Sequence, residues 1–434
     1  MLAVIMAGGK GTRLVQLTKG EIPKPMVEIL GKPLIEWQVE AIKKNGISEI
    51  IFVIGHLGSA IRGHFGDGSR FGIKAEYIEE TEPLGTAGAL FYLKDRIGNE
   101  PFLLVFGDVL FDIDLGRMAD FHTKNNAAAT LFVHPNSHPF DSDLVELSQG
   151  GKVTGFHLKL GRRDFWYRNC VNAGLYIISP EVCGSVSTPV RTDLEKDVLS
   201  KLVAEGAGVF AYRSPEYIKD IGTVERIEQA KRDIESGLIG MRCLKKQQKC
   251  IFLDRDGTVT KYKGLLSCID DLELEDGVAA AIRKVNSSGW LCVVVTNQSV
   301  VARGLCSLDD VEKIHMKMET LLGRDGAYLD DVLFCPHHPD KGYPEENPAY
   351  KIRCRCRKPA TGMLEEAAAR YNIDLPMSWI VGDTTLDIQT GRNAGTHTAL
   401  VLTGEAGKDG KYAAIPDITG STLLEIVDRI IGGK

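Results

Sequence analysis

The chain has 434 residues, of which 44% are hydrophobic and 25% charged, and its formal net charge is −6. This length exceeds one ordinary domain and predicts two globular domains of about 200 residues each. The negative charge disfavours nucleic acid or an anionic membrane as the main partner, although small phosphorylated ligands need only a local group of cations.

The predicted elements of the first half alternate between strands and helices. Strands are expected at 2–7, 49–55 and 101–108, and helices at 33–46 and 224–237. This alternation predicts βαβ units and a mostly parallel sheet. The apolar start of the chain runs into glycines and lacks a basic segment, so we interpret it as a buried strand of a cytoplasmic protein, not a signal peptide.

Regular periodicity is lost after the helix at 224–237, and a fresh apolar strand begins at 249. We therefore place a first domain at 1–240, a linker at 241–248 and a second domain at 249–434. The second half repeats the alternation, with strands expected at 249–254, 290–297, 379–383 and 398–404. No apolar stretch approaches the roughly 20 residues of a membrane span. Most of the ten cysteines are scattered, as is typical of reduced thiols.

A glycine-rich loop, AGGKGTRL, follows the first predicted strand. Gly8, Gly9 and Gly11 would let backbone amides approach a triphosphate closely, because no Cβ intervenes. Lys10 and Arg13 add positive charge. A tight turn between a strand and a helix would use the same glycines, so this motif alone is weak evidence for phosphate binding.

Further polar groups follow along the first half. Lys24 stands between two prolines, which stiffen its backbone and suit a phosphate contact, and Gly85 and Thr86 belong to a second glycine-rich turn. Asp108 follows a predicted strand, where open α/β sheets carry their sites, and Asp220 offers a second carboxylate. Two such carboxylates can hold Mg²⁺ against phosphate oxygens, although a lone aspartate at a strand end is more often structural.

Taken in order, the stretches GGKGTRL, PKP, EPLGTAGA, GD, NAG and DIGT resemble the sugar-1-phosphate nucleotidyltransferase family, of the mannose-1-phosphate guanylyltransferase type. The resemblance implies in-line attack of a sugar 1-phosphate on the α-phosphorus of a nucleoside triphosphate, with release of pyrophosphate. Positioning and charge neutralisation would carry this reaction. The implied triphosphate site consists of Gly8, Gly9, Gly11, Thr12, Arg13 and Lys24, the last two catalytic. The implied Mg²⁺ ligands are Asp108 and Asp220, and the implied sugar-side residues are Asn172, Glu195 and Lys196.

The chain departs from this family at two points. Gln16 replaces a proline, and a frequent EKP triplet is LKL here, which keeps Lys159 as a sugar-side candidate but loses the acid. The identity of the sugar is therefore open. Nearby arginines could contact a substrate phosphate, although a solvated basic loop explains them more simply: Arg162, Arg163 and Arg168.

Glu80 is the candidate for selecting the nucleotide base. It stands where relatives that choose pyrimidines carry glutamine, and a carboxylate only accepts hydrogen bonds. Guanine offers two adjacent donors on its Watson–Crick edge, and adenine does not. Glu80 therefore favours GTP over ATP, with Glu79 and Glu82 as alternative residues for this role.

The second half opens with a different motif, LDRDGT. Asp254 ends a predicted strand, and Asp256 points to the same side if the segment is extended. The first carboxylate could attack phosphorus and the second could protonate the leaving oxygen, whereas a capped turn would explain a bare DxD. Further along, Thr296 and Asn297 offer donors at a strand end, and Lys358 offers a cation.

With VGDTTLD, which carries Asp383 and Asp387, these motifs resemble the haloacid dehalogenase superfamily of aspartyl-phosphate phosphatases. The resemblance implies that Asp254 is the nucleophile and that Asp256 is the general acid and base. It also implies phosphoryl-binding residues and a Mg²⁺ site. The phosphoryl-binding residues are Thr296, Asn297 and Lys358. The Mg²⁺ site is formed by Asp254, Asp256 and Asp383, with Asp387 as a further late acid of that site.

Three cysteines of the second half are not scattered. Cys335, His337, Cys354 and Cys356 form two close pairs around a loop rich in proline, glycine and charge, which cannot build a core alone. Three thiolates and one imidazole suit a tetrahedral Zn²⁺, and four such ligands would make the site structural. His338 is an alternative ligand, and a loop of reduced cysteines without metal is the alternative interpretation.

The combination of DRDGT, TNQSVVARG, CPHH and CRCRKP is similar to one branch, the heptose 1,7-bisphosphate 7-phosphatases, near relatives of the histidinol phosphatases. The fold class implied for the chain is α/β with two Rossmann-like domains. The first would have a glycosyltransferase-A-like mixed sheet, and the second a haloacid-dehalogenase-like fold with a zinc loop. Candidates for binding the distal phosphate or the sugar are Arg303, Lys351, Arg353 and Arg357.

Together the halves predict a bifunctional enzyme, because removing the 7-phosphate of a heptose 1,7-bisphosphate yields a substrate for the first half. The expected partners are GTP and heptose phosphates, with Mg²⁺ in both domains and no nucleic acid or membrane; the chain could form a homo-oligomer. The nucleotide-activated heptose would serve surface glycans such as lipopolysaccharide, capsule or S-layer glycan.

Two alternatives to this function remain. One is a mannose-1-phosphate guanylyltransferase joined to a phosphatase of another substrate, such as histidinol phosphate. The other is a degenerate nucleotide-sugar-binding domain that regulates the phosphatase.

Overall fold

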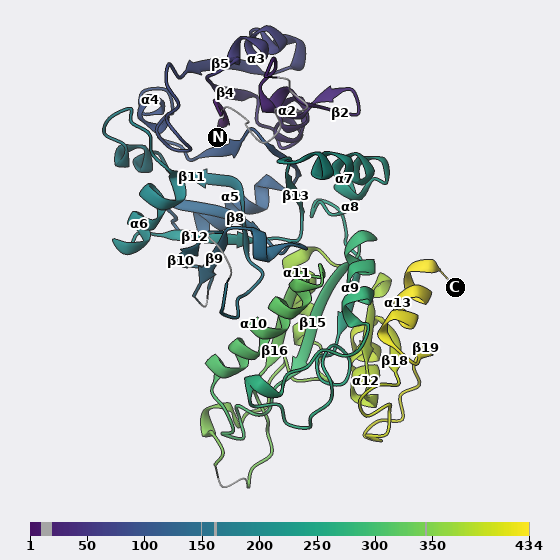
Figure 1. Cartoon of the computed structure of the whole chain (residues 1–434). Helices are drawn as coiled ribbons and strands as arrows, with labels where there is room; N and C mark the ends of the chain where they lie inside the picture. Colours follow the sequence, from purple (N-terminus) through teal and green to yellow (C-terminus); the bar gives the residue numbers. More distant parts are fainter. Residues whose placement is uncertain (10–19, 149, 160–162, 343–344, 434) are drawn as a thin grey trace. The chain divides into compact units, whose positions relative to one another are not determined.

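The computed structural model describes residues 1–9, 20–148, 150–159, 163–342 and 345–433 (Figure 1). The contacts within the chain divide it into two compact units. The first unit comprises Met1–His134, Asp143–Leu158 and Val171–Cys243. The second comprises Leu244–Lys434 and two segments of the first half, Pro135–Ser142 and Lys159–Cys170. Among the described residues, none of the helices combines the length and the apolar character that crossing a membrane requires.

The first unit is built on a mixed sheet whose main path runs β10-β9-β11-β6-β1-β4-β5, with β8 joined to β11 and β12 joined to β8. Its strands are β1 (Ala3–Ala7), β4 (Glu49–Ile54), β5 (Lys74–Glu79), β6 (Phe102–Phe106), β8 (Ala129–His134), β9 (Leu144–Leu147), β10 (Val153–His157), β11 (Val171–Ile178) and β12 (Val209–Arg213). Strands β5, β4, β1 and β6 pair in parallel, as does β12 with β8. Strand β11 runs antiparallel to β6, β8 and β9. The predicted mixed sheet is confirmed, and the expectation of mostly parallel pairing holds only in part.

The described part of the first unit also contains helices and two short two-stranded sheets. The helices are α2 (Leu34–Lys44), α3 (Gly58–Phe65), α4 (Leu90–Leu93), α5 (Leu115–Lys124), α6 (Ser200–Ala204), α7 (Val224–Glu235) and α8 (Leu238–Met241). One of these sheets is a hairpin that pairs β2 (Glu28–Ile29) with β3 (Lys32–Pro33), and the other pairs β7 (Val109–Asp112) with the distant β13 (Tyr217–Asp220). Helix α2 buries Ile35, Val39 and Ile42, which recur at helical spacing, and it ends before Gly46, whose φ is +79°. The strands and helices predicted for this half are confirmed as β1, α2, β4, β6 and α7.

The second unit contains a six-stranded, fully parallel sheet in the order β16-β15-β14-β17-β18-β19. Its strands are β14 (Cys250–Leu253), β15 (Leu291–Asn297), β16 (Asp331–Cys335), β17 (Trp379–Gly382), β18 (His397–Val401) and β19 (Ile418–Gly420). The four strands predicted from the sequence are confirmed as β14, β15, β17 and β18. A parallel sheet needs helices on both faces, because its strands bury both rows of side chains.

Strand β14 shows how the layers form. Ile251 and Leu253 join an apolar cluster with α9 (Val278–Ser287), α10 (Leu308–Arg324) and α13 (Leu423–Gly432). Phe252 points to the opposite face and packs with α11 (Gly362–Tyr371). The remaining long helix of this unit is α12 (Thr385–Ala394). Alternating side chains of one buried strand thus build both halves of the core.

The carboxyl ends of these strands gather the polar motifs at one edge of the sheet. Asp254 follows β14, Thr296 and Asn297 end β15, and Asp383 follows β17. This edge is where open α/β sheets bind their ligands, next to the point where strand order reverses around β14. The residues before β14 are not a free connector, since the main chain of Gln248 bonds to Asn372 and Asp374.

Candidate active sites

A cavity of about 550 Å³ opens in the first unit at the ends of β1 and β6. Seven of the predicted site residues line it: Gly8, Gly9, Lys24, Glu80, Gly85, Thr86 and Asp108. The structure thereby brings together four sequence motifs that lie apart along the chain. Gly11, Thr12 and Arg13 fall outside the described residues, as do Lys10 and Gln16.

Gly8 and Glu80 are in direct apposition inside this cavity. A Cβ on Gly8 would lie 2.3 Å from Oε2 of Glu80, so no larger residue fits at position 8 without displacing the carboxylate. Burial raises the pKa of Glu80 to about 7. Its Oε1 atom is buried and finds no hydrogen-bond partner among the described residues. A buried acceptor without a donor is costly, and a ligand that brings donors would satisfy it.

The two alternatives to Glu80 are placed differently. Glu79 is exposed and pairs with Arg62 at 3.2 Å, and Glu82 is also exposed. Neither residue lines the cavity. Of the three glutamates, Glu80 therefore has the position that base selection requires.

Lys24 and Asp108 form an ion pair of 2.5 Å on the cavity wall. The short helical turn that carries Lys24 begins after Pro23 and continues through Pro25. The backbone of Asp108 lies beside that of Asp220, because Ile221 N donates to Asp108 O at 2.7 Å. The Asp220 carboxylate is paired with Arg226. The two predicted Mg²⁺ ligands are thus on neighbouring backbones, each with a cation of its own.

Asn172, Glu195 and Tyr176 form a buried polar cluster in the first unit. Asn172 Nδ2 donates to Glu195 Oε1 at 3.0 Å, and Tyr176 OH donates to the same oxygen. Burial is the main cause that raises the pKa of Glu195 to about 7. Asn172 Oδ1 is buried and has no partner among the described residues. Lys196, the third predicted sugar-side residue, is exposed and does not join the cluster.

The basic stretch after β10 belongs to the second unit. Arg163 donates to the carbonyl oxygens of Pro139 and Ser142, and Arg168 pairs with Glu312 of α10. These two arginines are tied to protein groups, so the interpretation as a solvated loop is wrong for them. Arg162 lies outside the described residues, and a sugar-side role for Lys159 stays a prediction.

The second site is a group of three carboxylates. The ligand atoms of Asp254, Asp383 and Asp387 lie within 4.8 Å of one another. Lys358 Nζ lies 2.8 Å from Asp254 Oδ1 and 2.5 Å from Asp387 Oδ1. Burial raises the pKa of Asp254 to about 6 and that of Asp383 to about 8. Three crowded carboxylates with one lysine, and a buried Asp383 Oδ1 without a partner among the described residues, fit a divalent cation.

This group contains both predicted late acids, Asp383 and Asp387, and differs from the predicted Mg²⁺ site because the Asp256 side chain is not part of it. The Asp256 carboxylate instead accepts hydrogen bonds from Arg255 and Gln298. The reason is that Arg255, which is fully buried, draws this carboxylate toward itself. A magnesium contact by the Asp256 side chain is therefore not supported by this arrangement.

Thr296 and Asn297 lie at the same edge. The Thr296 hydroxyl accepts from Gln298 Nε2 at 2.9 Å. Asn297 is bound to the backbone of Lys358 through both ends of its amide, at 3.0 and 3.1 Å. Asn297 therefore holds Lys358 in place, and only one of its two amide hydrogens remains for a phosphoryl oxygen.

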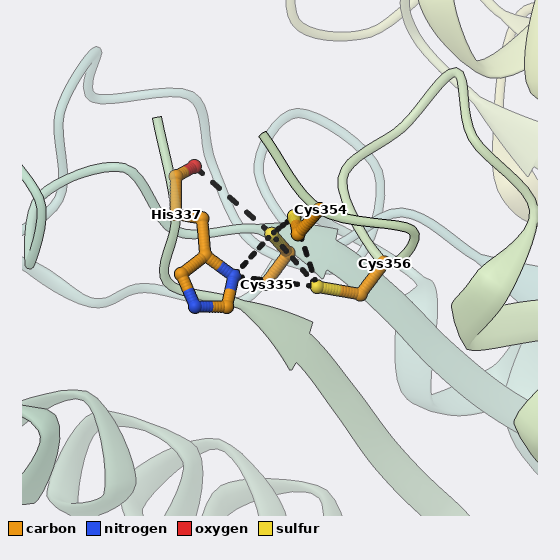
Figure 2. A group of neighbouring side chains, drawn as sticks. All are labelled: Cys335, His337, Cys354 and Cys356. Atoms are coloured by element: carbon orange, nitrogen blue, oxygen red, sulfur yellow. Dashed lines mark hydrogen bonds between the residues drawn. The ribbon is translucent and has the colours of Figure 1, made fainter. Parts of the chain in front are cut away.

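Cys335, His337, Cys354 and Cys356 come together as predicted (Figure 2). The Sγ atom of Cys356 lies 3.2 Å from each of the other two sulfurs and 3.5 Å from His337 Nδ1. Tetrahedral Zn²⁺ with Zn–S bonds of about 2.3 Å needs sulfurs roughly 3.8 Å apart, so a small expansion would admit the ion. The hydrogen bond from the Cys335 thiol lowers the pKa of Cys356 to about 5, which favours a thiolate in this cluster.

The alternative ligand His338 is not part of this cluster, and its Nδ1 accepts from Asp340 N. Burial lowers the pKa of His338, and so do the positive charges of Arg357, Arg303 and Lys351. These three predicted substrate-binding cations are thus within electrostatic reach of one imidazole. Arg353 is exposed and is not among them.

Sequence reasoning missed several residues of these sites. Arg191 lines the cavity of the first unit, in an irregular segment that carries no recognisable pattern. Arg255 and Gln298 contact Asp256, and each stands directly beside a motif residue, which was the available signal. His315 contacts Arg255 from α10, where its helical spacing looks like that of any core residue.

Residues 2–237 match the family model described as nucleotidyl transferase, which is more than half of the chain. The chain belongs to the nucleotidyl transferase family. Residues 355–426 match a second model, described as HAD-hydrolase-like. The chain is 40% identical over 187 residues to a D-glycero-D-manno-heptose-1,7-bisphosphate 7-phosphatase of Thermosynechococcus vestitus, which covers 42% of this chain and 94% of that relative. This nucleotidyltransferase therefore also carries a HAD-like phosphatase, and it is an enzyme in both halves.

Relatives of the first half include a mannose-1-phosphate guanylyltransferase of Mycobacterium tuberculosis, 30% identical over 237 residues, which cover 54% of this chain. The chain spans 65% of the length of that relative. Among solved structures, HddC from Yersinia pseudotuberculosis, in complex with GMP-PN, is 25% identical with a TM-score of 0.47. That match covers 54% of this chain and 98% of HddC.

Proposed function

We propose that this chain catalyses two consecutive steps of nucleotide-activated heptose synthesis. It removes the 7-phosphate of D-glycero-D-manno-heptose 1,7-bisphosphate and then transfers GMP from GTP to the resulting heptose 1-phosphate, releasing pyrophosphate. The observation that carries this proposal is the union, in one chain, of a nucleotidyltransferase with a phosphatase 40% identical to a heptose-1,7-bisphosphate 7-phosphatase. The product of such a phosphatase is a sugar 1-phosphate, the class of substrate that such a transferase uses.

In the phosphatase step, Asp254 attacks the phosphorus of the 7-phosphate. The bond between phosphorus and the sugar oxygen breaks, and Asp256 supplies a proton to that oxygen. Water then attacks the aspartyl phosphate, Asp256 takes the proton of that water, and Asp254 is released with inorganic phosphate. Lys358, held by Asn297, neutralises charge beside Asp254. Mg²⁺ held by Asp254, Asp383 and Asp387 would add positive charge at the phosphoryl oxygens.

In the transferase step, the cavity that contains Lys24, Asp108 and Gly8 would hold the triphosphate. A phosphate oxygen of heptose 1-phosphate attacks the α-phosphorus, the bond to the bridging oxygen breaks, and pyrophosphate leaves. Lys24 neutralises the charge that develops on the phosphoryl oxygens, and Asp108 orients the lysine through their ion pair. Asp108 and Asp220 would hold a Mg²⁺ that screens the same charge.

The preference for GTP rests on Glu80. Its buried Oε1, which has no hydrogen-bond partner among the described residues, is an acceptor inside the cavity, and guanine presents two adjacent donors.

The cluster of Cys335, His337, Cys354 and Cys356 supports a structural Zn²⁺ with a closed set of four ligands.

The boundaries at 1–240, 241–248 and 249–434 remain our proposal for where the two catalytic domains begin and end.

The test is phosphorus NMR of the protein with Mg²⁺, heptose 1,7-bisphosphate and either GTP or ATP. We expect loss of the 7-phosphate signal, followed by pyrophosphate and a nucleotide-sugar signal with GTP only. Release of phosphate without consumption of either nucleotide would contradict the consecutive scheme.

A second acceptor is part of the same experiment, because a relative of the first half is named as a mannose-1-phosphate guanylyltransferase. Mannose 1-phosphate is offered in competition with heptose 1-phosphate. If mannose 1-phosphate is the better acceptor, the first half belongs to a different step from the second.

A further inference from the structure

Among the described residues, Arg255 is the largest with less than 2% of its surface exposed, and its own exposed fraction is 0%. Burying a guanidinium is costly unless its donors are satisfied and its charge is paired. The backbone carbonyl of Arg255 is also fixed, since it accepts from the amides of Val259 and Thr260 at 2.9 and 2.8 Å. The backbone and the side chain of Arg255 are therefore both fixed, which packing in the core alone does not require.

The guanidinium of Arg255 makes a bidentate contact with the carboxylate of Asp256. Nε donates to Oδ1 at 3.0 Å and Nη2 donates to Oδ2 at 2.9 Å. Two parallel hydrogen bonds fix both the distance and the plane of a carboxylate, which a single bond cannot do. Asp256 follows Asp254 by two residues, so its orientation decides which atom beside the attacked phosphorus it can reach.

Two further side chains, Gln298 and His315, contact the Arg255 guanidinium and hold it in place. Gln298 accepts from Arg255 Nη2 at 2.8 Å and donates to Asp256 Oδ2 at 2.8 Å, so it closes a three-membered ring of hydrogen bonds. On the other side, Arg255 Nη1 lies 3.2 Å from Nε2 of His315. His315 is buried and its pKa is held well below the usual range by that burial and by Arg255. The imidazole is therefore neutral and accepts the hydrogen bond through Nε2.

We propose that Arg255, Gln298 and His315 are positioning residues of the phosphatase, which hold the Asp256 carboxylate in the orientation that proton transfer to the leaving oxygen requires. Asp256 is the catalytic residue, and the other three act through it. This inference rests on the proposed role of Asp256 and goes beyond it, because it assigns functions to three residues that have no role in the proposed mechanism.

A purely structural alternative makes a different prediction. If the network only stabilises the fold, its loss should affect every phosphatase substrate equally and should act independently of Asp256. If it works through Asp256, its loss should matter most when the leaving oxygen needs a proton. An alkyl phosphate such as the heptose bisphosphate needs one, whereas 4-nitrophenyl phosphate releases a stable phenolate without it.

The experiment uses Arg255→Met in the full chain, with both substrates and with Asp256→Asn as background. For the heptose bisphosphate, we expect Arg255→Met to lower kcat about 10- to 100-fold with KM within about 3-fold, a part of the 10²–10⁴ that general acid–base catalysis supplies. For 4-nitrophenyl phosphate we expect the pre-steady-state burst of 4-nitrophenolate, which reports formation of the aspartyl phosphate alone, to slow by less than about 3-fold. In the Asp256→Asn background, Arg255→Met should cost almost nothing more, because residues that act as a unit are not additive.

A matched pair at position 315 keeps the test decisive if Arg255→Met does not fold. His315→Gln retains an acceptor for Arg255, and His315→Leu removes it while keeping the volume. For the heptose bisphosphate, we expect the glutamine variant to keep kcat within about 3-fold and the leucine variant to lose roughly 10-fold, while the 4-nitrophenolate burst rate of both variants stays within about 3-fold of the parent rate. An equal loss in the 4-nitrophenolate burst rate, or effects that multiply with Asp256→Asn, would overturn the inference. Absence of heptose bisphosphate hydrolysis in the parent protein would instead overturn the proposed function.

Discussion

Nζ of Lys358 lies 2.8 Å from Oδ1 of Asp254, and the lysine side chain is only 2% exposed. Its backbone amide is fixed by Asn297, and its ammonium also donates to Val295 O at 3.0 Å. Because this lysine is buried and fixed, its positive charge stays beside the Asp254 carboxylate. The same charge can neutralise a phosphoryl group that this carboxylate attacks. The arrangement supports Asp254 as the nucleophile of the second half.

Asp254→Asn should therefore abolish phosphate release, because an amide cannot form the aspartyl phosphate. We expect a loss of more than about 10⁴-fold, the scale seen when a catalytic nucleophile is removed. Pyrophosphate release from GTP and pre-made heptose 1-phosphate should stay at the parent level. Phosphate release and pyrophosphate release, assayed separately by coupled enzymes, measure both.

Asp108→Asn is the converse control for that variant. It breaks the ion pair with Lys24 and should suppress pyrophosphate release while leaving phosphate release unchanged. Phosphatase activity in Asp254→Asn would contradict the assignment of the nucleophile. Loss of both activities in either variant would contradict the separation of the two sites.

Glu80→Gln should shift base selection, because glutamine replaces one acceptor oxygen by a donor. A charged hydrogen bond is worth about 1.5–3 kcal/mol, so kcat/KM for GTP should fall roughly 10- to 150-fold relative to UTP. Competition assays with the two triphosphates measure this ratio. The matched control is Glu79→Gln, since Glu79 is exposed and pairs with Arg62, and it should leave the ratio unchanged. A shift in the control alone would move the role away from Glu80.

The predictable parts of both sites are those at strand ends. Asp254, Thr296 and Asp383 follow or end apolar strands, and parallel pairing brings the carboxyl ends of such strands to one edge. The same logic placed Asp108 beside the glycine loop. The local pattern and the order of the motifs along the chain were enough to predict these residues, because parallel pairing of the strands brings them together in space.

Other features depend on contacts that local pattern does not encode. The antiparallel direction of β11 relative to β6 follows from how the chain returns, which apolar content alone does not reveal. His315 has the helical spacing of a core residue on α10, and only the structure places it against Arg255. Two loops of the first half, 135–142 and 159–170, group with the second unit through contacts such as Tyr167 N to Thr320 Oγ1, 153 residues apart.

Removing the zinc cluster should destabilise the second unit selectively. Cys356→Ser takes away the sulfur closest to the other three ligands, and metal binding energy is folding energy for such a loop. We expect a loss of at least about 3 kcal/mol, which lowers the melting temperature by roughly 6–12 °C in a unit of this size. The change should appear in calorimetry together with the loss of bound zinc in elemental analysis.

Cys268→Ser is the control for the cysteine substitution, because Cys268 is exposed and lies outside the cluster. It should change neither the melting temperature nor the zinc content. A parent protein that contains no zinc, or whose melting is unmoved by thorough chelation, would contradict the metal assignment.

Glu195 should make the stability of the first unit fall as pH rises from about 4.5 to about 7. Its pKa is about 7 in the folded chain against 4.5 as the ordinary value, so between these values the folded state holds a proton that the unfolded state has lost. Stability from this group is complete below about pH 4.5 and is lost by about pH 7, a change on the order of 3 kcal/mol. Glu195→Gln cannot titrate, so its free energy of unfolding relative to the parent should rise across that window.

Denaturant unfolding at stepped pH, with hydrogen exchange of β11 amides as the local readout, measures the difference. Glu205→Gln, at an exposed position of the same unit, should run parallel to the parent. Parallel curves for Glu195→Gln as well would mean that Glu195 is ionised in the folded chain, and its cluster with Asn172 and Tyr176 would then be a charged site.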